Sequence, residues 1–305
     1  MKKTIVLLAA AMLLTSAASG CRQSAEKTDS SSADRASAAV IDSDTTYDYE
    51  VREIYCDNNG KKIYGEAYIP KTGSKLATVI TSHGLGSNHE SGASYAKKYA
   101  PKGYAVYTFD FCGGSNSNNP NKSDGSPLEM SVMTEVSDLE AVLSAAKGWD
   151  FVDSDRIYLQ GGSQGGLVSA ITGIKHQDEI AGMILLYPAF GMYDLVCSFD
   201  DETLDDELRV GSMTVGKNFV TDLREYDVRE DLYKFTKPVI VIQGSEDETV
   251  LPENTEEAPK LFPDADYYVI EGAGHGFSGK HHDEASKLAL EFLDNRSEKR
   301  SKTDS

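Results

Sequence analysis

The segment "YLQGGSQGGL", residues 158–167, places four glycines around Ser163. Apolar residues precede it, and the apolar pattern that follows it predicts a helix. Gly161-x-Ser163-x-Gly165 between a strand and a helix is typical of a nucleophile elbow, a strained turn that lifts a serine hydroxyl above the edge of a sheet. Glycine at both flanks avoids a clash between the crossing strand and helix. The alternative interpretation is a glycine-rich strand-to-helix turn without a catalytic role.

Apolar runs separated by helical segments recur along the rest of the chain. They lie at residues 76–84, 104–111, 156–161, 182–188, 238–244 and 266–272. Several are almost continuous in valine, isoleucine, leucine and tyrosine, as expected of parallel strands that are covered on both faces. The alternation of strand and helix predicts an α/β fold with a doubly wound, mostly parallel sheet.

Turn and helix signals complete this pattern. Asn59-Gly60 separates two strand-like runs and predicts an N-terminal antiparallel hairpin over residues 49–69. The sequence "SPLE" at 126–129 is a capping box with proline at the first helical position, so it predicts that a helix begins there. We expect one further helix directly after the elbow and a last one over residues 282–294.

The strand and helix pattern extends over residues 47–297 and predicts one domain. Within it, residues 189–236 separate two strands by more than a simple crossover requires. Insertions of that length are usually functional, so we predict a cap insertion here. Four aromatic residues around its start either line an acyl pocket or pack between cap and core: Tyr187, Phe190, Tyr193 and Phe199. Residues 298–305 are charged and polar, and predict a disordered tail.

The N-terminus has the form of an export signal. Two lysines precede an apolar stretch at 4–14 that is too short to favour a membrane-spanning helix. Small residues then lead directly to Cys21 and resemble the lipobox of bacterial lipoproteins. We therefore predict a signal peptide over residues 1–20 and lipidation of Cys21, with an ordinary secretory signal as the alternative. The polar residues 21–46 predict a flexible tether.

Charge and cysteine content narrow the possible partners. The formal net charge of −19 argues against binding to DNA, RNA or anionic lipid headgroups, and we interpret it as a solvated surface. Besides Cys21 the chain has Cys56, Cys112 and Cys197, and an odd number leaves at least one of them unpaired. No CxxC spacing occurs, so the sequence predicts no metal site.

A serine nucleophile needs a base and an acid, which in this architecture follow it in the order acid, then histidine. Asp247 comes directly after the strand-like run at 238–244, and Glu246 and Glu248 beside it are rival acids. His275 lies between two glycines after the last strand-like run, where small neighbours let an imidazole reach the serine. We predict His275 as the base and Asp247 as its orienting acid. The alternatives are a structural histidine and a solvated acidic turn.

An oxyanion hole needs two N–H donors aimed at the developing charge. Gln164, the residue after the nucleophile, supplies one of them. The sequence "HGLG" at 83–86 follows an early strand and has the form that contributes the second donor, which points to the N–H of Leu85. Its glycines leave the backbone open to a substrate oxygen. We interpret His83 as a residue that braces this loop.

Together these segments resemble the serine α/β-hydrolases, and more narrowly the small bacterial esterases of the feruloyl/cinnamoyl type. The resemblance covers residues 47–297 and is carried by "HGLG" at 83–86, "FDFCGGSNS" at 109–117, "GGSQG" at 161–165, "GSED" at 244–247 and "GAGHGF" at 272–277. It implies that Ser163 is the nucleophile, His275 the base and Asp247 its orienting acid. It also implies that the insertion at 189–236 forms a cap over an acyl pocket.

The sequence thus predicts a serine carboxylesterase that hydrolyses small acyl esters, with feruloyl or cinnamoyl groups among them, and that needs no metal or organic cofactor. We expect it to be exported and held by lipid at the outer face of the bacterial cytoplasmic membrane, or otherwise secreted. One alternative is a peptidase of the prolyl oligopeptidase-like group, which shares the elbow but normally carries a propeller domain. The other is a non-catalytic surface binding protein on a hydrolase scaffold.

Overall fold

The structure is a computed structural model that describes residues 45–303. The predicted signal peptide at 1–20, the predicted lipidation site Cys21 and the predicted tether as far as residue 44 lie outside the described residues. Within 45–303, no helix combines the length and the hydrophobicity needed to cross a bilayer.

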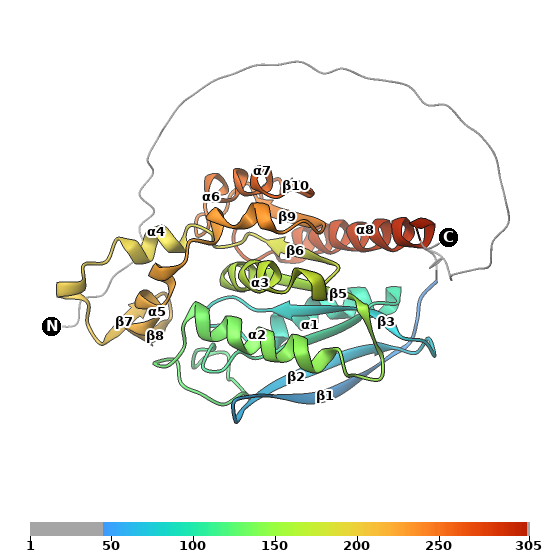
Figure 1. The fold of residues 1–305 in the computed structure, drawn as a ribbon, viewed down its shortest axis with the longest axis horizontal. Helices are drawn as coiled ribbons and strands as arrows, with labels where there is room; N and C mark the ends of the chain where they lie inside the picture. Colours follow the sequence, from blue (N-terminus) through green and yellow to red (C-terminus); the bar gives the residue numbers. More distant parts are fainter. Residues whose placement is uncertain (1–44, 304–305) are drawn as a thin grey trace, which may run out of the picture.

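An eight-stranded sheet in the order β1-β2-β4-β3-β5-β6-β9-β10 forms the middle layer of the molecule (Figure 1). β2 pairs antiparallel with β1 and β4, and all other neighbours pair parallel. The strands are β1 (Tyr49–Asn58), β2 (Lys61–Pro70), β3 (Leu76–Ser82), β4 (Ala105–Phe109), β5 (Val152–Gly162), β6 (Gly182–Leu186), β9 (Val239–Gly244) and β10 (Ala265–Ile270). The prediction of a mostly parallel α/β-hydrolase sheet with an N-terminal antiparallel hairpin is confirmed. Asn59 and Gly60 form its turn at φ values of 52° and 88°.

Helices cover both faces of this sheet, with α2 and α3 on one face and α1 and α8 on the other (Figure 1). The α-helices outside the insertion are α1 (His89–Tyr99), α2 (Val132–Ala146), α3 (Gln164–Lys175), α6 (Pro252–Glu256), α7 (Ala258–Leu261) and α8 (Gly279–Thr303). Short 3-10 helices span Ala100–Lys102, Gln177–Glu179, Asp201–Thr203, Leu223–Glu225, Val228–Glu230 and Leu232–Lys234.

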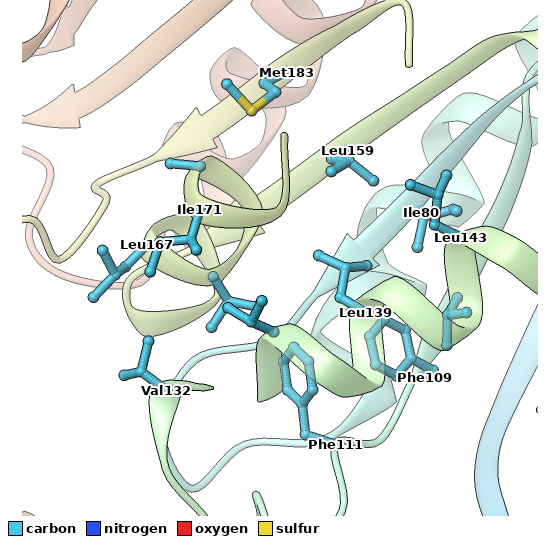
Figure 2. Packing of buried hydrophobic residues seen from close by; sticks show 14 of the residues in the cluster. Ile80, Phe109, Phe111, Val132, Leu139, Leu143, Leu159, Leu167, Ile171 and Met183 are labelled. Atoms are coloured by element: carbon cyan, nitrogen blue, oxygen red, sulfur yellow. The ribbon is translucent and has the colours of Figure 1, made fainter. Parts of the chain in front are cut away.

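Side chains alternate between two apolar cores along the central strands. On β3, Ile80 belongs to the core under α2 and α3, whereas Val79 belongs to the core under α1 and α8. Leu159 and Tyr158 divide in the same way on β5. Successive strand residues point to opposite faces, so a strand covered on both sides is apolar at most of its positions rather than at every second one. Figure 2 shows the first core, where Leu139 of α2 faces the sheet.

The predicted start of α2 was wrong by several residues. The helix begins at Val132, and its capping box is made by Ser131 and Thr134 rather than by Ser126 and Glu129. The Ser131 hydroxyl accepts a hydrogen bond from the N–H of Thr134 at 3.2 Å, and the Thr134 hydroxyl accepts one from the N–H of Ser131 at 2.9 Å. Threonine can therefore close a capping box in place of the glutamate that the sequence pattern favours.

The last helix is longer at both ends than predicted. α8 spans Gly279–Thr303 instead of 282–294, and thus includes residues 298–303 of the predicted disordered tail. Beyond Gly279 this segment contains neither glycine nor proline and is rich in lysine, arginine and glutamate, which are good helix formers. Extending an existing helix is also far easier than starting a new one.

The insertion at 189–236 folds into α4 (Met192–Cys197), the hairpin β7 (Glu207–Val210) and β8 (Met213–Gly216), and α5 (Asn218–Thr221). Figure 1 shows these elements grouped at one end of the molecule, beside the start of α2. The amide of Asn218 donates to the carbonyls of Glu129 and Met130 at 3.0 and 3.2 Å. The Ser131 hydroxyl donates to Asp222 at 2.7 Å. The insertion is therefore attached to the residues that open α2.

The core under α2 and α3 predicts the cost of removing one of its side chains. Leu139 is 0% exposed, so Leu139→Ala should lower the free energy of unfolding by about 2–5 kcal/mol through lost burial and the cavity left behind. Leu128, which is 43% exposed, provides the control, and Leu128→Ala should cost less than about 0.5 kcal/mol. Urea unfolding of both variants measures the difference, and equal losses would contradict this packing.

Candidate active site

Ser163 occupies a strained turn between β5 and α3. Its φ of 57° and ψ of −122° lie in a region that non-glycine residues rarely adopt. A Cβ on Gly161 would stand 2.1 Å from the carbonyl oxygen of Gly165, and a Cβ on Gly165 would stand 2.2 Å from the carbonyl oxygen of Ser82. The two glycines are thus required by close backbone approach, as the elbow prediction assumed.

His275 and Asp247 lie in line with this serine. The Nε2 atom of His275 is 3.1 Å from the Oγ atom of Ser163, and its Nδ1 atom is 2.9 Å from Asp247 Oδ2 and 3.1 Å from Asp247 Oδ1. These three residues are far apart in the sequence. They meet because the loops after β5, β9 and β10 all leave the carboxyl edge of the parallel part of the sheet.

The environment of Asp247 separates it from the two rival acids. Asp247 is 2% exposed, whereas Glu246 and Glu248 are exposed and point away from the core. Its Oδ1 atom accepts hydrogen bonds from the N–H groups of Thr249 and Val250, both at 2.9 Å. Burial by itself would raise the pKa of Asp247, but the hydrogen bonds from His275 and from these backbone donors outweigh burial and lower it. The carboxylate therefore stays charged beside the imidazole.

Tyr187, the residue after β6, packs against the imidazole from the side. Its ring lies 4.8 Å from the rings of both His275 and Phe277, at interplanar angles of 61° and 90°. The backbone of Tyr187 is also strained, with a φ of 37°, and is held by a hydrogen bond from its N–H to the carbonyl of Ile242 at 2.7 Å. The sequence left two roles open for Tyr187, which were lining a pocket and packing between cap and core. The structure places its ring against His275.

The loop that carries Leu85 lies directly beside the elbow. A Cβ on Gly84 would stand 3.3 Å from the Cβ of Ser163, so a side chain at that position would press against the serine. His83 braces the loop, as predicted: its Nδ1 is 2.9 Å from the carbonyl of Gly84, and its Nε2 accepts from the N–H of Phe111 at 3.1 Å. Burial lowers the pKa of His83, which favours the neutral ring that this pair of contacts requires.

Asp110, which the sequence analysis left without a role, fixes the far end of the same loop. This fully buried residue follows β4, and its Oδ1 accepts from both the backbone N–H and the Nδ1 of His89 at 2.7 Å. Its Oδ2 accepts from the N–H of Lys122 at 2.9 Å. Since His89 opens α1, Asp110 anchors the loop at the point where it becomes helix. The sequence feature that could have pointed to Asp110 is a carboxylate directly after a strand that is predicted to be buried.

The side chain of Gln164 has a partner that the sequence did not reveal. Gln164 is 0% exposed, and its amide nitrogen donates to Glu135 Oε2 at 2.7 Å. Glu135 lies in the first turns of α2 and is also 0% exposed. Burial, which outweighs the hydrogen bond from Gln164, raises the pKa of Glu135 well above its ordinary value. The sequence feature that could have pointed to Glu135 is a glutamate on the apolar face of a predicted helix.

The insertion approaches this edge of the sheet through the tip of its hairpin. Ser212 Oγ accepts a hydrogen bond from the amide nitrogen of Asn116 at 2.7 Å. A Cβ on Gly86 would stand 3.2 Å from the sulfur of Met213, so the hairpin touches the loop that carries Leu85.

Cys56 and Cys112 are buried and Cys197 is exposed, and all three are free thiols.

A family match covers most of the domain that holds this site. Residues 92–300, more than half of the chain, match the prolyl oligopeptidase family. The chain belongs to the prolyl oligopeptidase family. Sequence analysis had placed this group second, behind the feruloyl/cinnamoyl-type esterases. The family match does not overturn the resemblance to those esterases, and the assignment to the α/β-hydrolases is confirmed.

Solved structures of two bacterial proteins are similar to this chain. Est1E from Butyrivibrio proteoclasticus, determined with ferulic acid bound, is 26% identical, with a TM-score of 0.73 over 80% of this chain and 98% of Est1E. The esterase EaEST from Exiguobacterium antarcticum is 19% identical, with a TM-score of 0.59 over 78% of this chain and 98% of its own, and shares the fold. The quorum-quenching protein AidA from Acinetobacter baumannii (strain MDR-ZJ06) is 25% identical over 116 residues, which span 37% of this chain and only 36% of AidA.

The close approach at the elbow leads to a direct test. Gly165→Ala would press a methyl group into the carbonyl oxygen of Ser82, so we expect a loss of about 1–3 kcal/mol in unfolding free energy and a shift of Ser163 that lowers turnover by about 100-fold. Gly148→Ala is the matched control, because its Cβ would meet its nearest neighbour at an ordinary 3.5 Å. Unfolding and kinetic measurements on both variants suffice, and a Gly165→Ala enzyme with unchanged turnover would show that the elbow tolerates a side chain.

Proposed function

We propose that this protein is a serine carboxylesterase that acts on small acyl esters, with Ser163 as nucleophile, His275 as base and Asp247 as the acid that orients it. The observation that carries the proposal is the continuous hydrogen-bonded line from Ser163 Oγ through the imidazole to Asp247, with distances of 3.1 and 2.9 Å. A serine, an imidazole and a buried carboxylate in this order are the parts of an acyl-transfer site.

In the proposed reaction, Ser163 Oγ attacks the ester carbonyl carbon while His275 Nε2 takes the hydroxyl proton. Asp247 accepts the hydrogen bond from Nδ1–H and thereby fixes the tautomer in which Nε2 is free to act as base. The C–O bond to the alcohol then breaks, and the alcohol leaves with the proton from Nε2. Water attacks the acyl-enzyme by the same route in reverse and releases the acid and the free serine.

The tetrahedral intermediates carry a negative oxygen, for which we propose the N–H groups of Leu85 and Gln164 as donors. Gln164 is the first residue of α3, where backbone N–H groups have no partner within the helix and the helix dipole is positive. Leu85 follows Gly84, whose α-carbon lies against Ser163. Donors held at these two positions would lower the barrier without having to move as charge develops.

For the acyl group of the substrate we propose a chemical class. The similarity to Est1E, whose structure holds ferulic acid, supports a small acyl group of the feruloyl or cinnamoyl type. Membership of the prolyl oligopeptidase family supports a second candidate, a peptidase that would use the same nucleophile on an amide. We favour the ester because the described residues hold a single α/β-hydrolase unit with a small insertion at the site. A surface binding protein without turnover is the third outcome.

We also propose that the protein is exported and held by a lipid on Cys21 at the outer face of the bacterial cytoplasmic membrane, or otherwise secreted. The support is in the sequence alone: a basic start, a short apolar stretch and small residues directly before the cysteine. Metabolic labelling with a palmitate analogue, compared between the wild type and Cys21→Ser, tests the anchor.

The proposed activity is tested by three substrates for the purified domain: a short acyl nitrophenyl ester, a feruloyl ester and an aminoacyl anilide. We expect ester turnover to exceed anilide turnover, and Ser163→Ala to lower it by about a millionfold while the melting temperature changes little. Faster anilide turnover would favour the peptidase. Absence of turnover together with absence of fluorophosphonate labelling at Ser163 would favour the binding protein.

The role of Asp247 is tested against its neighbours. Asp247→Asn keeps the size of the side chain but stabilises the wrong tautomer of His275, so kcat should fall by about 10,000-fold. Glu246→Gln and Glu248→Gln remove one charge each from the same loop and are exposed controls that should change kcat by less than about threefold. A large loss in either control with a small loss in Asp247→Asn would assign the acid to another residue.

A further inference from the structure

A carboxyl group that the proposed mechanism does not use lies behind the nucleophile. Glu135 on α2 and Gln164 at the start of α3 are each 0% exposed, and one hydrogen bond of 2.7 Å joins Gln164 Nε2 to Glu135 Oε2. The two helices lie side by side on the same face of the sheet (Figure 1). A carboxyl group is rarely buried to this extent without a partner of opposite charge.

Each of these two side chains has one oxygen that takes no part in the hydrogen bond between them. Glu135 Oε1 and Gln164 Oε1 are both buried, and neither has a hydrogen-bond partner within the described part of the chain. An ionised carboxylate and an amide carbonyl can only accept hydrogen bonds at these atoms, so two buried acceptors on a hydrogen-bonded pair of side chains would remain unsatisfied. A single proton on Glu135 Oε1 supplies the missing donor and leaves no buried charge.

The surroundings of the carboxyl favour that proton. Asp138 on the same helix raises the pKa of Glu135 further, because two negative charges repel each other. His83 approaches the same carboxyl group beside Gly114. The position that a Cβ on Gly114 would take is 3.1 Å from both Glu135 Oε1 and His83 Cε1. His83 is braced as a neutral ring by Gly84 and Phe111, so it offers the carboxyl no positive charge.

We propose that Glu135 is protonated and forms a cyclic acid–amide pair with Gln164, and that this pair positions the Gln164 N–H as an oxyanion donor. In the pair, Gln164 Nε2–H donates to Glu135 Oε2 and Glu135 Oε1–H donates to Gln164 Oε1. Glu135 is a positioning residue, since it reaches the reacting atoms only through Gln164. This inference rests on the proposed function, because it concerns the donor that stabilises the acyl-transfer intermediate.

The pair acts directly beside the strained backbone of Ser163. Gln164 directly follows Ser163, and its side chain is the link between the elbow and α2. α2 is itself fixed at its start, because the Ser131 hydroxyl binds Asp222 of the insertion and the carbonyl of Ser131 accepts the N–H of Glu135 at 3.0 Å. The geometry of the oxyanion donor is thus set by a neighbouring helix as well as by the glycines of the turn.

The test compares Glu135→Leu, Glu135→Gln and Glu140→Leu with the wild type on the preferred ester. Leucine cannot hold Gln164, so kcat should fall by about 10- to 100-fold while KM changes by less than about threefold. Glutamine can form the same cyclic pair, with two N–H donors and two carbonyl acceptors, and should retain at least about half of kcat. Glu140, on the outer side of α2 beside Lys175, is the matched control for loss of a glutamate.

Each outcome decides one part of the inference. A folded Glu135→Leu enzyme with wild-type kcat would overturn the positioning role, and a Glu135→Gln enzyme as slow as Glu135→Leu would overturn the acid–amide pair. If Glu135→Leu does not fold, Gln164→Met replaces it, because it removes the same link and keeps the backbone donor; wild-type kcat in that variant overturns the inference.

An infrared measurement separates this inference from the proposed function. A protonated carboxyl has a carbonyl band above that of a carboxylate, and the band should be present in the wild type and absent in Glu135→Gln, whether or not an ester is turned over. Absence of the band in the wild type overturns the proton. Absence of ester turnover in the wild type overturns the proposed function instead.

Discussion

The arrangement of the active-site edge depends on one strained residue, Ser163, whose backbone can be held in its unusual conformation only where strand and helix approach within touching distance. Gly161 and Gly165 permit that approach, and Gly84 lets the neighbouring loop pass beside the serine. A strain of this kind costs on the order of 1–3 kcal/mol and persists only where the surrounding structure holds it. Here the N–H of Ser163 donates to the carbonyl of Leu186 at 3.0 Å, and its carbonyl accepts from the N–H of Ala189 at 3.0 Å. The remaining residues of the site are placed relative to this turn.

Three buried titratable groups at this edge differ in whether their charged form is favoured. Asp247 receives hydrogen bonds from His275 and two backbone N–H groups, so its charge is stabilised despite burial. Glu135 receives one hydrogen bond, from an uncharged amide, and its charge is disfavoured. His83 lies between a carbonyl and an N–H group and is held neutral. The number and type of hydrogen-bond donors, rather than burial alone, therefore decide where charge resides.

The family and the solved structures describe different aspects of the molecule. The prolyl oligopeptidase family accounts for the unit that contains the elbow, and Est1E shows that a similar unit can accommodate ferulic acid. Ester and amide hydrolysis share the nucleophile, the base and the oxyanion donors, so these parts do not distinguish the two. The difference depends on the residues around the site, where the hairpin of the insertion contacts the loop at Gly86.

The sequence by itself determined the elements that depend on local chemistry: the sheet strands, the Asn59-Gly60 hairpin and the glycine-flanked turn at Ser163 were predicted because each is a short-range pattern. It also predicted His275 and Asp247 as the partners of Ser163, from their order after successive strands and from the resemblance, with two rival acids left open. Their catalytic roles stay a prediction. Only the tertiary structure decided that Asp247 rather than Glu246 or Glu248 meets His275, and that Glu135 meets Gln164. Such choices depend on which side chains are buried together, and burial is set by contacts between segments distant in the sequence.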